Sequence, residues 1–167
     1  MDHADMVTSE FDFISLMIPH HQEAVVTSRE INKNTTNESL KKLTQDIVDA
    51  QNKEIAMMQW WLVTWYSGQT YTGMPYMPMM RPGMMVVWST GIAEQMYLED
   101  MIIHHQWAID MAQKLLQIMD ESDMRIRVTA EWWAYRKSLR EFANAIITTQ
   151  GQEIEQMKEM LRIKASR

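Results

Sequence analysis

The sequence predicts an all-α protein, a four-helix bundle made of two duplicated helical hairpins. Glycine and proline are sparse, at 5 and 4 of 167 residues, so few strands and turns are expected. Apolar residues recur at helical spacing along four long segments. The stretch 13–25, which contains a His-His pair, also aligns without a gap on 97–109, which contains a second one. Two amphipathic hairpins form a bundle, in which we expect the first and third helices to run parallel.

The first hairpin is expected over residues 9–66. Ser9, with Asp12 three positions later, is a short-acid version of the capping box and predicts the start of the first helix. The polar residues 32–37 predict the turn, and the second helix follows over about 38–66.

The remaining chain is expected to form a loop and the second hairpin. Residues 67–88 interrupt the helical pattern with a long loop rich in Met, Pro and Gly, between helices two and three. The second hairpin is expected over 89–163, with its turn at 120–123. A chain of this length suits a single core, so we expect one domain over 1–167.

The repeat extends to the second and fourth helices. Glu54 and Met58 of the second helix match Glu153 and Met157 of the fourth helix. We therefore expect both glutamates to face inwards, near the level of the histidines.

The second hairpin is the longer of the two and is expected to extend beyond the first at its turn end. This predicted overhang carries Trp132, Trp133 and Tyr135. The aromatic side chains either form a contact surface or pack on the third helix.

Composition excludes several classes of function. The formal net charge of −6 and the absence of a basic run disfavour binding to nucleic acid. No apolar stretch of about 18 residues is present, so no membrane span is expected. The chain has no Cys and 18 Met. A thioether-rich chain without thiols suits an oxidising compartment, which favours a periplasmic or secreted protein whose export signal has been removed.

Each histidine pair follows a methionine at helical spacing. Met17 lies three and four positions before His20 and His21, so the thioether and the imidazoles share about one helical turn. The second copy repeats this arrangement with Met101, His104 and His105. Thioether and imidazole are soft and borderline donors, and together they indicate copper, with Cu(I) first.

The two histidines of a pair differ by about 100° around the helix. His20 and His104 share the apolar stripe and are expected to point inwards. We expect His21 and His105 to face a neighbouring groove or the solvent.

Further methionines are candidate ligands. Met58 and Met157 come from the second and fourth helices, and Met111 follows His104 by two helical turns. The first-copy counterpart of Met111 is Thr27, so the second copy is expected to be richer in sulfur and to hold Cu(I) better. Packing in the core explains these methionines equally well.

The loop and the amino terminus are candidate sites of other kinds. Thioethers in the loop can gather around Cu(I) or Ag(I), although an apolar loop over the core is the alternative. The loop candidates are Met77, Met79, Met80, Met84 and Met85. A free amino terminus followed by His3 can surround Cu(II) or Ni(II) with a square of nitrogens.

The ligand motifs of the familiar metal enzymes with this architecture are absent from the sequence. Di-iron and di-manganese bundles need Glu-x-x-His twice, and this spacing does not occur in the chain. A blue-copper site needs a Cys, and the chain has none. No nucleophilic triad or glycine-rich phosphate loop is visible, so a binding function is favoured over these kinds of catalysis.

The repeated Met-Ile-x-His-His-Gln strings resemble those of a bacterial family, the domain of unknown function 305 family, and especially one of its copper-binding periplasmic members. The resemblance implies a ferritin-like four-helix bundle that binds copper and silver and acts in copper resistance outside the cytoplasm. It implies as ligand positions Met17, His20, His21, Met101, His104, His105 and Met111. Thr27 departs from the pattern because it lacks sulfur.

We therefore predict an extracytoplasmic copper-binding protein that is not an enzyme. Cu(I) is the expected ion, with Cu(II) as a further candidate and silver as a surrogate. A copper exporter or sensor is the candidate protein partner. Two alternatives remain open: a copper-dependent redox enzyme whose tryptophans pass electrons, and a metal-free helical interaction module.

Overall fold

The computed structural model describes residues 3–70, 92–123 and 129–166 of the chain. A short 3-10 helix, η1 (His3–Met6), precedes the long helices. These are α1 (Glu10–Asn34), α2 (Glu38–Trp65), α3 (Ile92–Asp123) and α4 (Ala130–Ala165). The third helix thus runs four residues past its predicted end at Met119.

Side-chain caps begin three of the helices. The backbone N–H of Asp12 donates to Ser9 Oγ over 3.1 Å, which confirms Ser9 as the predicted N-cap of α1. Asn37 Oδ1 accepts the first free N–H groups of α2, and Thr129 caps α4 in the same way. The helix starts therefore follow local sequence signals.

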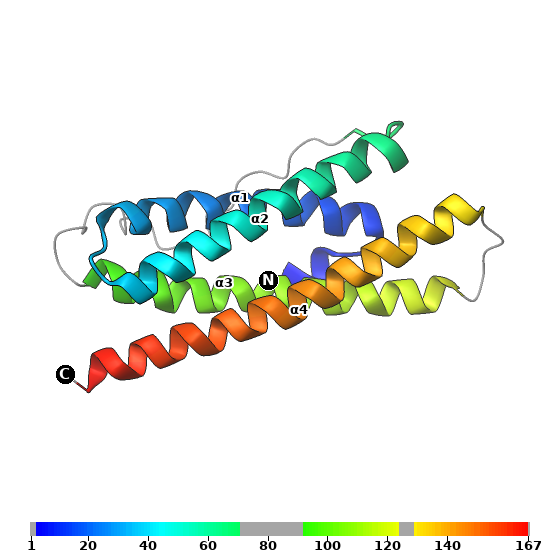
Figure 1. The fold of residues 1–167 in the computed structure, drawn as a ribbon. Helices are drawn as coiled ribbons and strands as arrows, with labels where there is room; N and C mark the ends of the chain where they lie inside the picture. Colours follow the sequence, from blue (N-terminus) through cyan, green and yellow to red (C-terminus); the bar gives the residue numbers. More distant parts are fainter. Residues whose placement is uncertain (1–2, 71–91, 124–128, 167) are drawn as a thin grey trace.

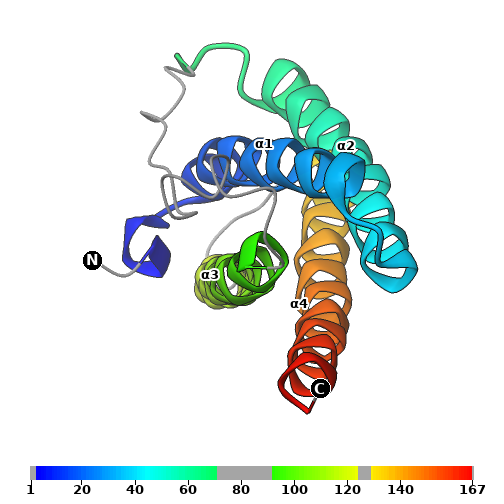
Figure 2. The same cartoon turned by 90° about the vertical axis from the view of Figure 1, so that its left-hand side faces the viewer.

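The helices pair as predicted. Helix α1 packs along α2, and α3 packs along α4, so the protein is an all-α four-helix bundle of two hairpins (Figure 1). In the view from the end of the bundle, the α1–α2 hairpin lies above the α3–α4 hairpin (Figure 2). No helix within the described ranges is both long and apolar enough to cross a membrane.

Helices α1 and α3 run antiparallel, so the predicted parallel arrangement is wrong. Ser28 Oγ lies 2.7 Å from the Tyr97 hydroxyl, whereas His20, eight residues earlier, contacts His104, seven residues later. The end of α2 and the start of α3 therefore lie at opposite ends of the bundle. Periodicity shows which face a helix buries but carries no information about direction, and only packing between the hairpins decides it.

The core consists of two clusters that the repeat relates to each other. One holds Phe13, Met17 and Met58. The other holds their counterparts Tyr97, Met101 and Met157. Because the hairpins are antiparallel, the clusters lie on either side of the level at which the histidines meet.

The aromatic side chains at the start of α4 pack on the end of α2. Trp65 stacks on Tyr135 with ring centroids 5.1 Å apart, and it meets Trp132 edge-on at 6.0 Å. Tyr135 is 3% exposed and lies in the same core cluster as Leu115 and Met119 of α3, which agrees with the predicted packing on the third helix, whereas Trp133 remains 47% exposed. The antiparallel arrangement explains the contact with α2, because it brings the turn end of the second hairpin to the open end of the first.

Candidate metal centre

Two histidines from α1 and α3 meet at the middle of the bundle. The rings of His20 and His104 lie with centroids 3.6 Å apart, and both side chains are buried. His20 Nε2 is 3.0 Å from the backbone oxygen of His104. A carbonyl oxygen only accepts, so Nε2 of His20 carries the proton and Nδ1 keeps its lone pair.

The second histidine of each pair contacts a glutamate of the neighbouring helix. His21 Nε2 lies 2.8 Å from Glu54 Oε2, and His105 Nε2 lies 2.9 Å from Glu153 Oε2. These contacts confirm that both glutamates face inwards at the level of the histidines. Of the two expected surroundings of His21 and His105, a neighbouring groove and the solvent, the structure shows the first, since both are fully buried against the neighbouring helix. Their side of α1 and α3 is covered by α2 and α4 within each hairpin.

A third carboxylate lies beside His104 and was not predicted. Glu23 is 3% exposed, and its Oε2 lies 3.5 Å from His104 Nε2. The second copy has Trp107 at the equivalent position, so the repeat gave no signal for Glu23. The position of this acidic residue one turn after His20 was the available clue.

Three of the four histidines share one pattern of hydrogen bonding. His20, His21 and His105 each direct Nε2 to an oxygen atom within 3.0 Å, whereas Nε2 of His104 only approaches Glu23, at 3.5 Å. In each ring Nδ1 is buried and has no hydrogen-bond partner among the described residues. A buried nitrogen without a partner costs about 1–3 kcal/mol, so these four Nδ1 atoms are the atoms of the centre that remain free to bind a ligand.

Burial keeps the central histidines neutral. It lowers the pKa of His20 well below the ordinary 6.5, and the charges of His104, His21 and His105 lower it further. Burial also lowers the pKa of His104 to about 4, although Glu23 partly offsets this effect. At neutral pH both rings are therefore unprotonated imidazoles, which is the form that binds a metal.

The candidate sulfur ligands divide between the two core clusters. Met17 and Met58 lie in one cluster together with Met111, while Met101 and Met157 lie in the other. The first-copy methionines thus have the extra sulfur beside them. Our expectation that Met111 enriches the second copy needs correction, because antiparallel packing places this residue against the other hairpin.

Thr27 occupies the position equivalent to Met111 and uses its hydroxyl locally. Thr27 Oγ1 donates to the backbone oxygens of Glu23 and Ala24, at 2.9 and 3.2 Å. The hydroxyl is therefore satisfied within α1. The two halves of the centre are not chemically equivalent.

The histidines do not form a carboxylate-rich metal site. Within the described ranges, no three His, Asp or Glu side chains gather so that they could hold a metal ion. A metal at this level would thus need thioether ligands as well as imidazole, which is the softer donor set that favours Cu(I).

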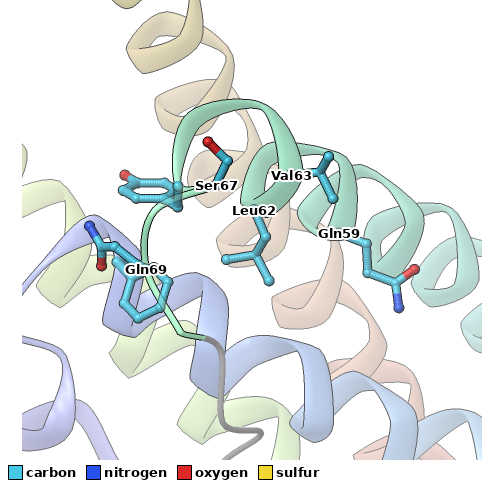
Figure 3. Close-up of a pocket in the computed structure, with 7 residues that line it drawn as sticks. Gln59, Leu62, Val63, Ser67 and Gln69 are labelled. Atoms are coloured by element: carbon cyan, nitrogen blue, oxygen red, sulfur yellow. The ribbon is translucent and has the colours of Figure 1, made fainter.

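An open pocket lies elsewhere, at the end of α2. It has a volume of about 470 Å³. Its lining combines Phe11 of α1 with residues around the end of α2, including Leu62, Val63 and Tyr66 (Figure 3). Its lining contains no histidine or methionine, so it is separate from the candidate metal centre, whose four histidines are buried.

The remaining predicted ligands lie outside the described residues. This applies to the loop methionines Met77, Met79, Met80, Met84 and Met85. It applies equally to the amino-terminal site, which needs Met1, Asp2 and the His3 side chain.

Solved structures resemble the whole bundle. CopM in its Cu(II)-bound form is 26% identical over 90% of this chain and 94% of that chain, with a TM-score of 0.69. CopM soaked with silver is 25% identical over 90% of this chain and 93% of that one, with a TM-score of 0.66. A Streptomyces coelicolor protein with the provisional designation of a secreted protein is 25% identical over 92% of this chain and 90% of that one, with a TM-score of 0.68.

No curated protein sequence is a significant match to the chain. The sequence profile of a domain of unknown function, DUF305, matches residues 10–161. This range begins at the first residue of α1 and ends near the end of α4, so it includes both histidine pairs. The chain therefore belongs to the DUF305 family.

Proposed function

We propose that this protein binds copper outside the cytoplasm and buffers it or delivers it, without catalysing a reaction. The observation that carries the proposal is the set of four buried Nδ1 atoms without partners, at one level of the bundle and with buried thioethers on either side. Imidazole nitrogen and thioether sulfur together favour Cu(I), and Ag(I) shares this preference.

The chain's own residues prepare this level for a soft cation. His20 and His104 are unprotonated at neutral pH, so no proton has to leave them. Met17 and Met101, each one turn before a histidine pair, supply sulfur from α1 and α3. The surrounding helices exclude water, which protects a bound Cu(I) ion from oxidation and slows its release.

The comparisons support copper and silver as the ions. The described forms of CopM hold Cu(II) and, after soaking, silver, and this chain is 26% and 25% identical to them over nine-tenths of its length. We extend the proposal to Cu(II) as a second oxidation state.

The location and partners are part of the same proposal. The chain lacks Cys, and the related Streptomyces coelicolor protein is provisionally designated as secreted. A periplasmic or secreted protein of this kind would exchange copper with an exporter or sensor protein. The loop methionines and His3 are further candidate ligands for capture of the ion.

The test is a Cu(I) titration against a competing chelator in anaerobic buffer. Replacing Met17 and Met101 by Leu removes both sulfurs at nearly constant volume, so the fold should be retained. We expect a loss of at least tenfold in Cu(I) affinity. Met119→Leu is the matched control, since Met119 is a fully buried core methionine that lies away from the histidines and should leave the affinity unchanged.

A second variant tests the nitrogen ligands. Replacing all four histidines by Leu should abolish tight Cu(I) binding. Wild-type protein with no Cu(I) affinity above non-specific background, or a histidine-free variant with unchanged stoichiometry, would contradict the proposal.

A further inference from the structure

The same histidine–glutamate pair occurs twice in the bundle. His21 contacts Glu54 across α1 and α2, and His105 contacts Glu153 across α3 and α4, at 2.8 and 2.9 Å. Other positions around the centre differ between the copies, as in Glu23 against Trp107. The pair is thus retained in both halves while its surroundings diverged.

Each carboxylate determines which ring nitrogen carries the proton. An ionised carboxylate only accepts hydrogen bonds, so the histidine nitrogen that faces it must be a donor. In both pairs this nitrogen is Nε2. Nδ1 is then the nitrogen with a lone pair in a neutral ring, and it is also the nitrogen left without a partner in both residues.

Neighbouring amides do not compete for these carboxylates. Gln51 and Gln150 lie one turn before Glu54 and Glu153, and both are buried. The amide atoms of both glutamines have no hydrogen-bond partner within the described residues. The two glutamates therefore remain available to the imidazole rings.

Stability alone gives a poor account of the two pairs. The side chains of Glu54 and Glu153 are 20% and 11% exposed, so each carboxylate loses much of its hydration. A partly buried polar pair of this kind often contributes no more stability than apolar residues of equal volume. Metal-binding histidines, in contrast, commonly donate their other ring N–H to a carboxylate, which fixes the ring and its tautomer.

We propose that Glu54 and Glu153 are positioning residues of the copper site, which hold His21 and His105 in the Nε2–H form and so present Nδ1 as the ligand nitrogen. The inference rests on the proposed copper-binding function and specifies the ligand atom in each ring. At His20 the acceptor for the Nε2 proton is a backbone carbonyl, that of His104, whereas His21 and His105 each use a carboxylate.

The first experiment observes the ring nitrogens directly. Nitrogen-15 NMR of the metal-free protein distinguishes the Nε2–H tautomer, the Nδ1–H tautomer and the imidazolium ion, with single His→Gln variants to assign the signals. We expect His21 and His105 as neutral Nε2–H rings. Addition of Ag(I), which is diamagnetic, should shift the Nδ1 signals while Nε2 keeps its proton.

The second experiment removes the fixed acceptor. Glu54→Gln and Glu153→Gln keep the size of the side chain but offer an NH₂ group as well as an oxygen, so both tautomers become possible. We expect mixed tautomers in the metal-free double variant and a loss of about 10–100-fold in Cu(I) affinity. Glu121→Gln is the control, since Glu121 lies on the surface and, among the described contacts, accepts a hydrogen bond only from Gln117. This substitution should change neither the histidine tautomers nor the Cu(I) affinity.

The outcomes separate this inference from the proposed function. A wild-type protein with Nδ1–H or imidazolium rings, or with Ag(I) on Nε2, overturns the positioning role even when copper binds tightly. Unchanged tautomers and affinity in the double variant overturn it as well. Failure of the wild-type protein to bind Ag(I) or Cu(I) instead contradicts the proposed function, and this result is independent of the tautomers of the metal-free protein.

Discussion

The imidazole rings of His20 and His104 face each other at a centroid distance of 3.6 Å, although the residues are 84 positions apart. They are equivalent residues of the internal repeat. A residue can meet its own counterpart in this way when an approximate two-fold axis relates the two hairpins and passes between the two side chains. The candidate centre therefore belongs to both hairpins at once, and each hairpin adds one outer histidine–glutamate pair.

The metal-free protein should lose stability as the pH falls from 6.5 towards 4. His104 has a pKa of about 4 in the folded state, against 6.5 in an unfolded chain. In that window the unfolded state binds more protons, so the free energy of unfolding decreases as the pH drops, by at most about 1.4 kcal/mol per pH unit for one group. The lowered pKa of His20 acts in the same direction.

Urea denaturation at a series of pH values measures this effect. The carboxylates also titrate in the lower part of the window, so the comparison is with His104→Gln, which lacks the titrating ring. A variant with the same pH slope as the wild-type protein would contradict the assignment to His104.

Met111 should strengthen Cu(I) binding through the cluster that it shares with Met17 and Met58. Met111→Leu removes the sulfur with little change in volume, so the free energy of unfolding should change by less than about 1.5 kcal/mol. We expect the Cu(I) affinity to fall about tenfold, which corresponds to about 1.4 kcal/mol. Competition with a chelator measures it, and an affinity equal to that of Met119→Leu would show that Met111 only fills the core.

The hydrogen bond between Ser28 and Tyr97 should show energetic coupling. The two hydroxyls are 2.7 Å apart and buried. Ser28→Ala leaves the Tyr97 hydroxyl without this partner and should cost about 1–3 kcal/mol. The double variant, Ser28→Ala with Tyr97→Phe, removes both hydroxyls and should cost less than the two single changes together.

The repeat itself supports this expectation. Phe13 and Ala112 are the counterparts of Tyr97 and Ser28, and they lie together in the first core cluster without any hydroxyl. A thermal or urea double-mutant cycle measures the coupling. Strictly additive costs would mean that the two hydroxyls do not stabilise one another.

Arg136 should be a strong determinant of stability at the end of the bundle. Its Nε lies 3.0 Å from Glu10 Oε1, and its Nη2 donates to Met119 O over 3.1 Å and to Ser122 Oγ over 2.7 Å. Both charged side chains are nearly buried, at 4% and 12% exposure. Arg136→Met leaves the Glu10 carboxylate without this cation and should cost about 3–5 kcal/mol.

The neighbouring Lys137 provides the comparison for this prediction. Its contact with Glu141 is 3.9 Å long, and the two side chains are 78% and 68% exposed. Lys137→Met should therefore change the free energy of unfolding by less than about 1 kcal/mol. Equal effects of the two substitutions in urea denaturation would refute the role assigned to Arg136.

The sequence by itself determined the elements of the fold and the level of the site. Helical periodicity and the cap at Ser9 predicted the α1–α2 hairpin closely, because both depend on neighbouring residues. The internal repeat predicted that Glu54 and Glu153 face inwards near the level of the histidines. A repeat shows which residues are equivalent, and equivalent residues lie at equivalent heights in equivalent hairpins.

Only the tertiary structure decided how the two hairpins face each other. The antiparallel direction of α1 and α3 placed Met111 in the same core cluster as Met17, brought Glu23 to His104, and packed Tyr135 on the end of α2. None of these contacts lies within one hairpin repeat. They depend on a choice between two orientations that bury similar apolar stripes, and the side chains at the crossing, not the period of the sequence, make that choice.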